Sequence, residues 1–522
     1  MLNVIFYNPP EDKETKYYEY DASGNLITTT ITERTYTIRE TACETLTSAK
    51  YLFAEPELIG SFTGSMVSLN DAEGMFSGSD IEFVTGKDGE PADFSSLTIA
   101  DFMFANCSKL TSINAKMPSL KHAEGIFDAC PALVSVKGDL SGLEDGAYMF
   151  DGCTLEEFDA PLTSLKDGEG MFASSKITGF KYNLPNLENG VKMFNGCTGF
   201  TEFSGSLTSL KLANEMFANT KITSFTSALP SLENGTRMFY DCQQLGTVTL
   251  DAPNLINATE MVAKTSISTI DIQCPKLAYA NNMFDMCKSL NTVTGKLENA
   301  ITADTMFREC DALSSVSLDM PKVESAKNMF QGASTFRSFT GNLGRLKYGN
   351  QMFKSTVINV FNPTRLDFLE NSTEMFWGSQ LKNWAWNMPA LQHGNYMFQG
   401  SRFMESFKSD LERLTNGTGM FESCAGLYEF IGVLPKLEQG NDMFKGCKLN
   451  AQSVMYIIES VPTHTSGTHS ITIGIGCTKD NAALDAFAQD AGYNDRVDMH
   501  TRLTSKGWTV TWSIGSELLS SL

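Results

Sequence analysis

Residues 107–129 read CSKLTSINAKMPSLKHAEGIFDA, and Cys130 begins the same pattern again. The apolar positions of this stretch are Leu110, Ile113, Ala115, Leu120 and the pair Ile126-Phe127. A leucine, then a β-branched or aromatic residue three positions later, then a small or apolar residue two positions after that, fit a short strand with alternate side chains inward. Each copy of the pattern therefore predicts one short strand.

The pattern recurs along most of the chain. A Met-Phe pair or a close variant returns every 22 or 23 residues, apart from one step of 28, and Val262 stands in the same frame. Counting Leu52-Phe53 as the first copy gives about eighteen turns. The later aromatic residues of the pair are Phe76, Phe104, Phe127, Phe150, Phe172, Phe194, Phe217, Phe239, Phe284, Phe307, Phe330, Phe353, Phe376, Phe398, Phe421 and Phe444.

A period of 22 to 23 residues falls in the leucine-rich-repeat range. A single coil of this size cannot bury its own apolar face, so the coils must stack to form a core. The sequence thus predicts a β-rich solenoid with one short parallel strand per coil.

The pattern C-x-x-L-x-x-(I/V/F)-x-x-x-(L/M)-P-x-L-x-x-x-x-x-M-F resembles the BspA-like class of leucine-rich repeats, which occurs in gut-bacteriophage virion proteins and in bacterial surface proteins. The resemblance covers about Leu52 to Leu449. The tail, with VMYIIESVPTHTSGTHSITIGIG and KGWTVTW, is similar to the end segment that often follows such repeats in phage and Bacteroides-type proteins. The recurring positions face the core, so they specify a fold more than a function.

The two ends of the chain lack the repeat. In residues 1–48, Val4 and Phe6 alternate, and two apolar stretches (17–20 and 26–31) flank a turn-like segment at 21–25, which predicts a small N-terminal β cap or attachment domain. Residues 49–449 form the predicted solenoid of about 18 coils. In residues 450–522, apolar spacing predicts helices near 454–461 and 484–491 and strands near 471–475 and 508–512, an α-β-α-β cap over the last coil.

Composition excludes several classes of partner. The chain carries 40 Lys and Arg against 61 Asp and Glu, a net charge of −21, whereas a nucleic-acid or anionic-membrane binder needs a basic surface. No apolar run approaches the roughly 20 residues of a membrane helix. The first residues have neither a basic nor an apolar leader region, so we expect no Sec-type export.

The cysteines occupy one slot of the repeat. Nine of the twelve lie three residues after the Phe position, where other turns hold Ser, Thr or Ala, so the slot requires a small side chain. We expect buried reduced thiols there rather than a zinc site. Neighbouring coils bring pairs such as Cys130 and Cys153 close enough for a disulfide to remain an open alternative.

No arrangement of residues indicates catalysis, a cofactor site or a metal site. His464 and His469 share the loop THTSGTH, which we interpret as a surface loop. Glu157 and Asp159 flank the inward Phe158, and the equivalents of Asp159 in the adjacent coils are Lys137 and Lys181. We interpret this set as a cross-strand charge ladder rather than a catalytic carboxylate pair.

Tryptophan marks one candidate contact region. Trp377, Trp384 and Trp386 lie within ten residues, and Trp377 occupies a position that is Ala, Asn or Asp in most turns. Exposed tryptophan often stacks on sugars or protein partners, so these three residues are candidate partner contacts, with local packing as the alternative. Elsewhere the outward strand positions are mostly Ser and Thr, which keep an exposed sheet soluble or line a binding surface.

The family resemblance implies a setting for the protein. It implies a non-enzymatic phage virion structural protein that displays its solenoid, in contact with other virion proteins and with a host-surface glycan or protein. A bacterial surface adhesin is the alternative, located on the cell surface instead of the phage particle. A glycan-cleaving tail enzyme, which would need a convergent pair of carboxylates, is a further alternative.

Overall fold

The computed structural model describes residues 2–7, 16–20, 26–28, 37–39, 46–54, 60–515, 517–520 and 522. The chain divides into two compact units, Met1–Leu255 and Ile256–Leu522. The domain boundaries expected at residues 48 and 449 stay predictions. The first unit contains β1 (Leu2–Tyr7), β2 (Lys16–Tyr20), β3 (Leu26–Thr28), β4 (Thr37–Arg39), β5 (Ser61–Thr63), β6 (Phe83–Thr85), the 3-10 helix η1 (Lys87–Gly89), β7 (Ala92–Asp93), β8 (Ser112–Lys116), β9 (Ser135–Asp139), β10 (Glu157–Asp159), β11 (Gly179–Phe180), β12 (Glu202–Phe203), β13 (Ser224–Phe225), β14 (Thr247–Val248) and β15 (Leu250–Asp251).

The second unit contains the remaining elements. Its coils carry β16 (Thr269–Gln273), β17 (Thr292–Lys296), β18 (Ser315–Ser317), β19 (Ser338–Gly341), β20 (Val360–Pro363), β21 (Asn383–Trp384), β22 (Ser406–Lys408) and β23 (Glu429–Ile431). Its tail carries α1 (Ala451–Ser460), β24 (His469–Gly474), α2 (Asn481–Asp490), α3 (Arg496–Thr504), β25 (Trp508–Ile514) and β26 (Glu517–Leu519). Among the described residues, no helix is long and apolar enough to cross a membrane.

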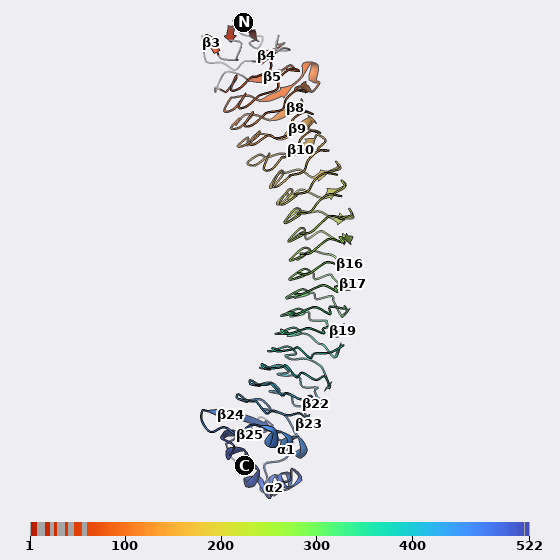
Figure 1. The fold of residues 1–522 in the computed structure, drawn as a ribbon, viewed down its shortest axis with the longest axis vertical. Coiled ribbons are helices and arrows are strands. Elements are labelled where there is room, and N and C mark those ends of the chain that lie inside the picture. The colour runs from red at the N-terminus through yellow and green to blue at the C-terminus, as the bar shows by residue number, and fades with distance from the viewer. Residues whose placement is uncertain are drawn as a thin grey trace. The chain divides into compact units, whose positions relative to one another are not determined.

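The predicted β-solenoid is confirmed in both units. Successive coils stack, and their short strands pair in parallel, as in β8 with β9 and β16 with β17 (Figure 1). A second parallel ladder runs along the Met-Phe side, five residues before the Phe position of each coil. It passes through Ser48, Asp71, Ile99, His122, Asp145, Asp167, Asn189, Leu212 and Asn234 in the first unit, and through Asn257, Tyr279, Thr302, Ser325, Tyr348, Asn371, His393, Asn416 and Gln439 in the second.

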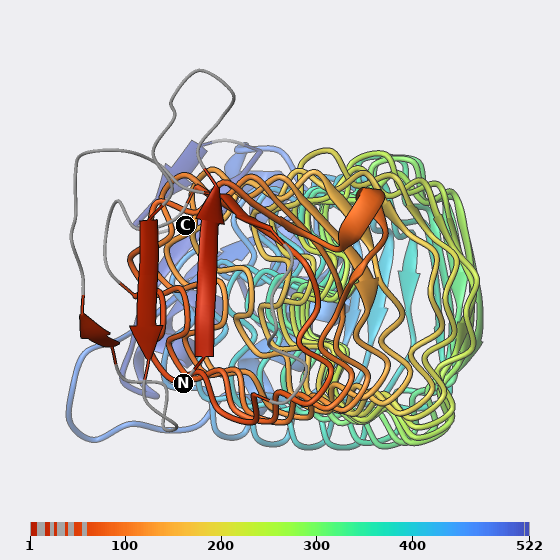
Figure 2. The same cartoon turned by 90° about the horizontal axis from the view of Figure 1, so that it is seen from above.

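The N-terminal strands join the first coils. β1 pairs antiparallel with β2 and β4, and β2 pairs antiparallel with β3. Figure 2 shows the β1–β2 pair as two opposed red arrows. β4 then pairs in parallel with β5, so the strands continue into the sheet of the coils. The expected strands near 4–6, 17–20 and 26–28 are present, β4 was not expected, and the turn at 21–25 and residues 29–31 lie outside the described residues.

Phenylalanine forms the centre of the core. Phe150, Phe172 and Phe194 are buried, and their rings stack with centroids 5.4 Å apart from one coil to the next. Each buried phenylalanine contributes roughly 1.5 to 3 kcal/mol of hydrophobic stabilisation, and ring pairs of this geometry add about 0.5 to 1.5 kcal/mol. This repeated stack explains why the Phe position recurs so strictly.

The Met-Phe side turns through left-handed residues. The residue two before the Phe adopts a positive φ, as Tyr148 does at 52° before Phe150. Its ring lies over the next coil, where a Cβ on Gly170 would come within 2.6 Å of it. Glycine therefore follows an aromatic residue one coil later, in the pairs Tyr51/Gly74, Phe102/Gly125, Tyr148/Gly170 and Tyr396/Gly419.

The tail covers the last coil. On the Met-Phe side each coil donates amides to the next, and in the last coil the amides of Gly440 and Phe444 donate to the carbonyls of Ser470 and Thr472 at 3.0 Å. The Gly446 amide donates to Ser513 Oγ at 2.8 Å. Without these acceptors the amides would be left unpaired at the end of the stack, which is costly.

The tail has two more elements than predicted. Its order is α1-β24-α2-α3-β25-β26 rather than α-β-α-β. Helix α3 buries only Met499 and Leu503, and it is capped at its N-terminus by Asp495, whose side chain accepts from the Asp498 amide. Two buried residues are too few to give a clear helical period in the sequence.

Candidate functional site

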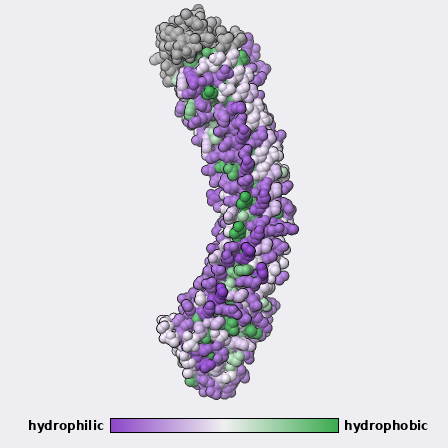
Figure 3. Space-filling view, in the orientation of Figure 1, coloured by the Kyte–Doolittle hydropathy of each residue, from purple (hydrophilic) through white to green (hydrophobic). Residues whose placement is uncertain are grey.

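The outward side chains of the coil strands form an exposed polar surface, which we call the strand face. The inward residue of most coil strands is buried and its neighbours point outward, as in β16 and β18, whereas the inward Phe158 of β10 is half-buried. In strands β8 to β14 the residue before the inward one is Ser112, Ser135, Glu157, Gly179, Glu202, Ser224 or Thr247, and in β6 it is Phe83. Figure 3 shows a largely hydrophilic visible surface with small, separate hydrophobic patches.

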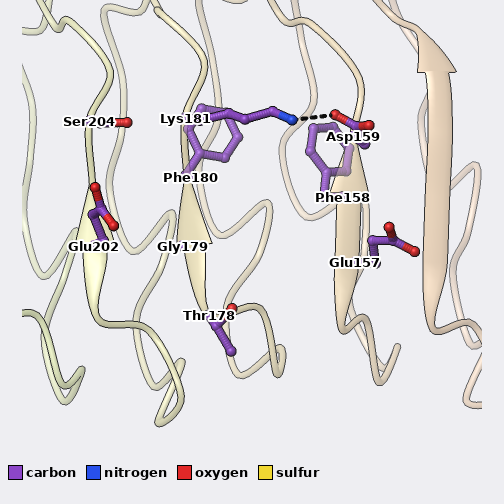
Figure 4. A pocket seen from close by; sticks show the side chains of 9 residues that line it. All are labelled: Glu157, Phe158, Asp159, Thr178, Gly179, Phe180, Lys181, Glu202 and Ser204. Carbon is purple, nitrogen blue, oxygen red and sulfur yellow. Dashed lines mark ion pairs between the residues drawn. The ribbon is translucent and has the colours of Figure 1, made fainter.

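A hollow of about 320 Å³ lies on the strand face of the first unit. Gly179 stands between Glu157 and Glu202 in the outward column, and because it has no side chain it leaves the space open (Figure 4). The hollow is lined by Glu157, Phe158, Asp159, Thr178, Gly179, Phe180, Lys181, Glu202 and Ser204.

Two ion pairs fix one side of the hollow. Lys181 Nζ lies 2.8 Å from Asp159 Oδ1, and Lys137 Nζ lies 2.8 Å from Glu157 Oε1. The Lys181 ammonium, helped by the Tyr182 hydroxyl that donates to the same carboxylate, lowers the pKa of Asp159. Lys137 likewise lowers the pKa of Glu157, together with the Ser135 hydroxyl.

The predicted charge ladder is therefore correct in register, and one of its lysines also has a second partner. Lys137 pairs with Asp159 in backbone register and its charge contributes to the lowered pKa of Asp159, while its ammonium makes its direct ion pair with the diagonal Glu157. A lysine side chain reaches either carboxylate, so register alone does not decide the pairing. Lys181 does bond Asp159 as expected.

Glu202 stands apart from these pairs. Its side chain is exposed at the rim of the hollow, and no cation or hydrogen-bond donor among the described residues contacts its carboxylate. Its column neighbours are Gly179 and Ser224, which offer no charge. The hollow thus has paired charges on one side and an unpaired carboxylate on the other.

The tryptophan cluster divides into a core residue and two partly exposed ones. Trp384 is 0% exposed, and its ring makes edge contacts with Phe376 and Phe398 at 5.3 and 5.1 Å. Trp384 is therefore a core residue. The prediction that it contacts a partner is wrong, and the alternative of local packing holds for this residue. The reason is its place eight residues after Phe376, the position of the inward strand residue.

Trp377 and Trp386 keep some exposed surface. Trp377 is 37% exposed, its Nε1 donates to Gln399 Oε1 at 2.9 Å, and Lys354 Nζ lies 5.7 Å from its ring. Trp386 is half-buried, with its ring 5.4 Å from that of Trp384. A contact role for Trp377 and Trp386 stays a prediction.

The cysteine slot is a hydrogen-bonding position of the core. All cysteines of the described residues are free thiols. The cysteines of the slot and Ser401 donate to the carbonyl of the preceding coil's Phe position, as Cys197 Sγ does to Phe172 and Ser401 Oγ does to Phe376, both at 3.0 Å. The threonines of the slot donate instead to the carbonyl of their own coil, as Thr220 Oγ1 does to Phe217 at 2.8 Å. A small donor at this position therefore finds a carbonyl acceptor in either way. Burial raises the pKa of the Cys197 thiol to about 11.

The histidine loop packs against the last coil. The rings of His464 and His469 stack at 3.5 Å beside Trp508, and their nitrogens contact the carbonyls of Leu437 and Glu438. Sequence reasoning did not anticipate this stacking. In the described part of the chain, no group of three or more His, Cys, Asp or Glu side chains is placed to hold a metal ion.

The fold and its repeated positions define a leucine-rich-repeat solenoid. The family model for the BspA type leucine-rich repeat region, written for six copies, matches residues 92–191, 121–246, 168–288 and 263–382. These segments together cover more than half of the chain, so the protein belongs to the BspA-type leucine-rich-repeat family. No curated protein matches the chain significantly.

Three of the solved structures that resemble the chain are bacterial leucine-rich-repeat or surface proteins. A leucine-rich repeat protein from Bacteroides ovatus shares 13% identity over 86% of this chain and 94% of its own, with a TM-score of 0.34. A leucine-rich cell surface protein from Faecalibacterium prausnitzii shares 12% over 82% and 94%, with a TM-score of 0.25. The pneumococcal vaccine antigen PcpA shares 13% over 76% and 84%, with a TM-score of 0.32. At these values the likeness says nothing about what this chain binds.

Sequence reasoning missed the hollow. Its signal was present, because Gly179 interrupts an outward column that carries glutamate in the coils on either side. The charge ladder drew attention to Asp159 and the lysines, whereas Glu202 had no partner to suggest it. A glycine between two charged residues of one outward column is the pattern that would have located the site.

Proposed function

We propose that this protein is a non-enzymatic binding protein whose strand face contacts a macromolecular partner. The observation that carries the proposal is the hollow beside Glu202, a recess with an unpaired charge on a polar surface that the stacked core holds rigid. Repeat solenoids commonly bind partners on such extended surfaces.

The charges at the hollow argue against glycan cleavage. A glycosidase needs one carboxylic acid with a raised pKa to protonate the leaving group. Lys137 lowers the pKa of Glu157, which favours its ionised form. The side chain is largely exposed, so the desolvation that opposes this effect is smaller than the contributions of Lys137 and Ser135.

A second part of the proposal concerns where the protein is located and which partners it meets there. The repeat resemblance leads us to propose a place on a phage virion, where other virion proteins and a host-surface glycan or protein would be the partners. A bacterial cell surface is the alternative setting. Copurification of the native protein with sedimenting phage particles supports the first, and labelling of intact bacterial cells by an antibody against the protein supports the second.

Binding by the strand face is tested with the purified chain. We would probe it against glycan arrays and intact bacterial cells, alongside the variant S224R/T247R, which places two long cations on the strand face. Thr208→Arg, an exposed position of the same unit outside the strand face, is the matched control. We expect the double variant to lose at least tenfold in binding while Thr208→Arg retains it. Equal binding by all three proteins would refute a role of the strand face.

A further inference from the structure

The hollow has a geometry suited to one long side chain of a partner. Neighbouring parallel strands lie about 4.8 Å apart, so the backbones of Glu157 and Glu202, two coils apart, are separated by about 10 Å across Gly179. Glu202 lies at the rim of this space, whereas the Glu157 carboxylate turns away from Gly179 toward Ser135 and Lys137 of β9 (Figure 4). A planar group with hydrogen-bond donors on more than one edge fits in the open space over Gly179, where Glu202 accepts from one edge and the hydroxyl oxygens of the rim accept from another.

One carboxylate at the hollow has no cationic partner among the described residues. Lys137 and Lys181 neutralise Glu157 and Asp159, and Glu202 is left without a cation among the described residues. The first unit as a whole has 17 Lys and Arg against 35 Asp and Glu. Long-range attraction therefore draws a positively charged partner to this unit, and Glu202 offers the local contact.

The surrounding side chains select the class of occupant. Thr178 and Ser204 add hydroxyl oxygens at the rim, which accept from the same donors as a carboxylate. The guanidinium of arginine carries five donors in a rigid plane and pairs with carboxylates on more than one edge, which a lysine ammonium matches less well. The uncharged column beyond the hollow, Ser224 and Thr247, leaves room for the rest of a polypeptide.

We propose that the hollow over Gly179, beside Glu202, binds an arginine side chain of a protein partner. This inference rests on the proposed function, since it names the partner chemistry of the strand face. The probe is a fluorescent peptide with four arginines spaced by glycine and serine, and its citrulline counterpart, which keeps the shape but loses the charge. Fluorescence anisotropy at physiological salt measures binding to the full chain.

Two variants separate the hollow from general acidity. Gly179→Ser fills the space without changing charge, and Glu202→Gln removes the charge without filling the space. Each should weaken arginine-peptide binding about tenfold, whereas Glu233→Gln, an exposed glutamate of the same unit outside the hollow, should change it less than twofold. A Cβ at position 179 would lie 3.2 Å from the Glu202 carbonyl, so Gly179→Ala serves as a milder second variant if the serine variant melts early.

The outcomes are distinct. Equal losses in the Glu202→Gln and Glu233→Gln proteins, or equal binding of the citrulline peptide, would overturn the inference and leave only non-specific attraction. If a macromolecular partner is lost with S224R/T247R but survives Gly179→Ser and Glu202→Gln, the proposed function stands and the arginine site fails. If the arginine peptide binds the hollow while no macromolecule binds the strand face, the proposed function fails instead.

Discussion

Removal of one ring from the phenylalanine stack is the sharpest test of the core. Phe172 is fully buried, stacks on Phe150 and Phe194 at 5.4 Å, and makes an edge contact with Phe158 at 4.8 Å. Phe172→Ala removes these ring pairs and opens a cavity that the adjacent coils cannot close, because each is held by its own backbone ladder. We expect a loss of about 3 to 5 kcal/mol in the free energy of unfolding.

Urea unfolding followed by circular dichroism measures this loss. Ser224→Ala, an exposed change on the strand face of the same unit, is the control and should cost less than about 0.5 kcal/mol. We expect the coils around the cavity to unfold at a lower urea concentration than the distant coils of the first unit, because each coil of a repeat array is stabilised mainly by its neighbours. Similar losses for the two variants would mean that the inward and outward faces have been assigned wrongly.

Three further predictions concern the turns, the thiols and the charges. Gly170→Ala should destabilise the protein by about 2 kcal/mol or more, because the residue has a φ of +58° and its new methyl would meet the Tyr148 ring; the added change Tyr148→Ala should recover part of that loss in thermal melts. The melting temperature should be the same with and without excess reductant, since the described cysteines are free, and a large fall on reduction would contradict that assignment. Lys181 lowers the folded-state pKa of Asp159, so this pair stabilises the fold above about pH 4, the range of a free aspartate, and its contribution is lost as the pH falls through the lowered value. Lys181→Met should remove that part of the pH dependence in urea unfolding at a series of pH values, and the effect should be small because water screens so exposed a pair.

Much of the fold was predictable because the same pattern of apolar and small residues recurs in successive coils. The Phe frame predicted the inward strand residues, the outward polar column and the small side chain at the cysteine slot. The same frame also predicts that Trp384 is buried. Trp384 lies eight residues after Phe376, as the buried Phe361 lies eight residues after Phe353. The tryptophans were grouped by nearness in sequence instead, and that grouping joined side chains with different burial.

Features that occur once were harder to predict. Helix α3 depends on two buried residues and an N-cap at Asp495, which leave almost no periodic signal. The partner of Lys137 depends on side-chain reach, which the register of a column does not specify. The hollow depends on a missing side chain at Gly179, and an absent group is visible only against the column that the structure defines.

Site-specific photo-crosslinking tests the central claim, partner binding at the strand face, most directly. A photoreactive amino acid at position 204, on the rim of the hollow, is compared with one at position 192, an exposed site on the Met-Phe side of the same unit. Both proteins are irradiated on intact cells or assembled particles, and the adducts are identified by mass spectrometry. We expect one dominant adduct from position 204, formed with a partner polypeptide near an arginine, and none from position 192. Adducts from position 192 alone, or equal adducts from both positions, would contradict binding at the strand face.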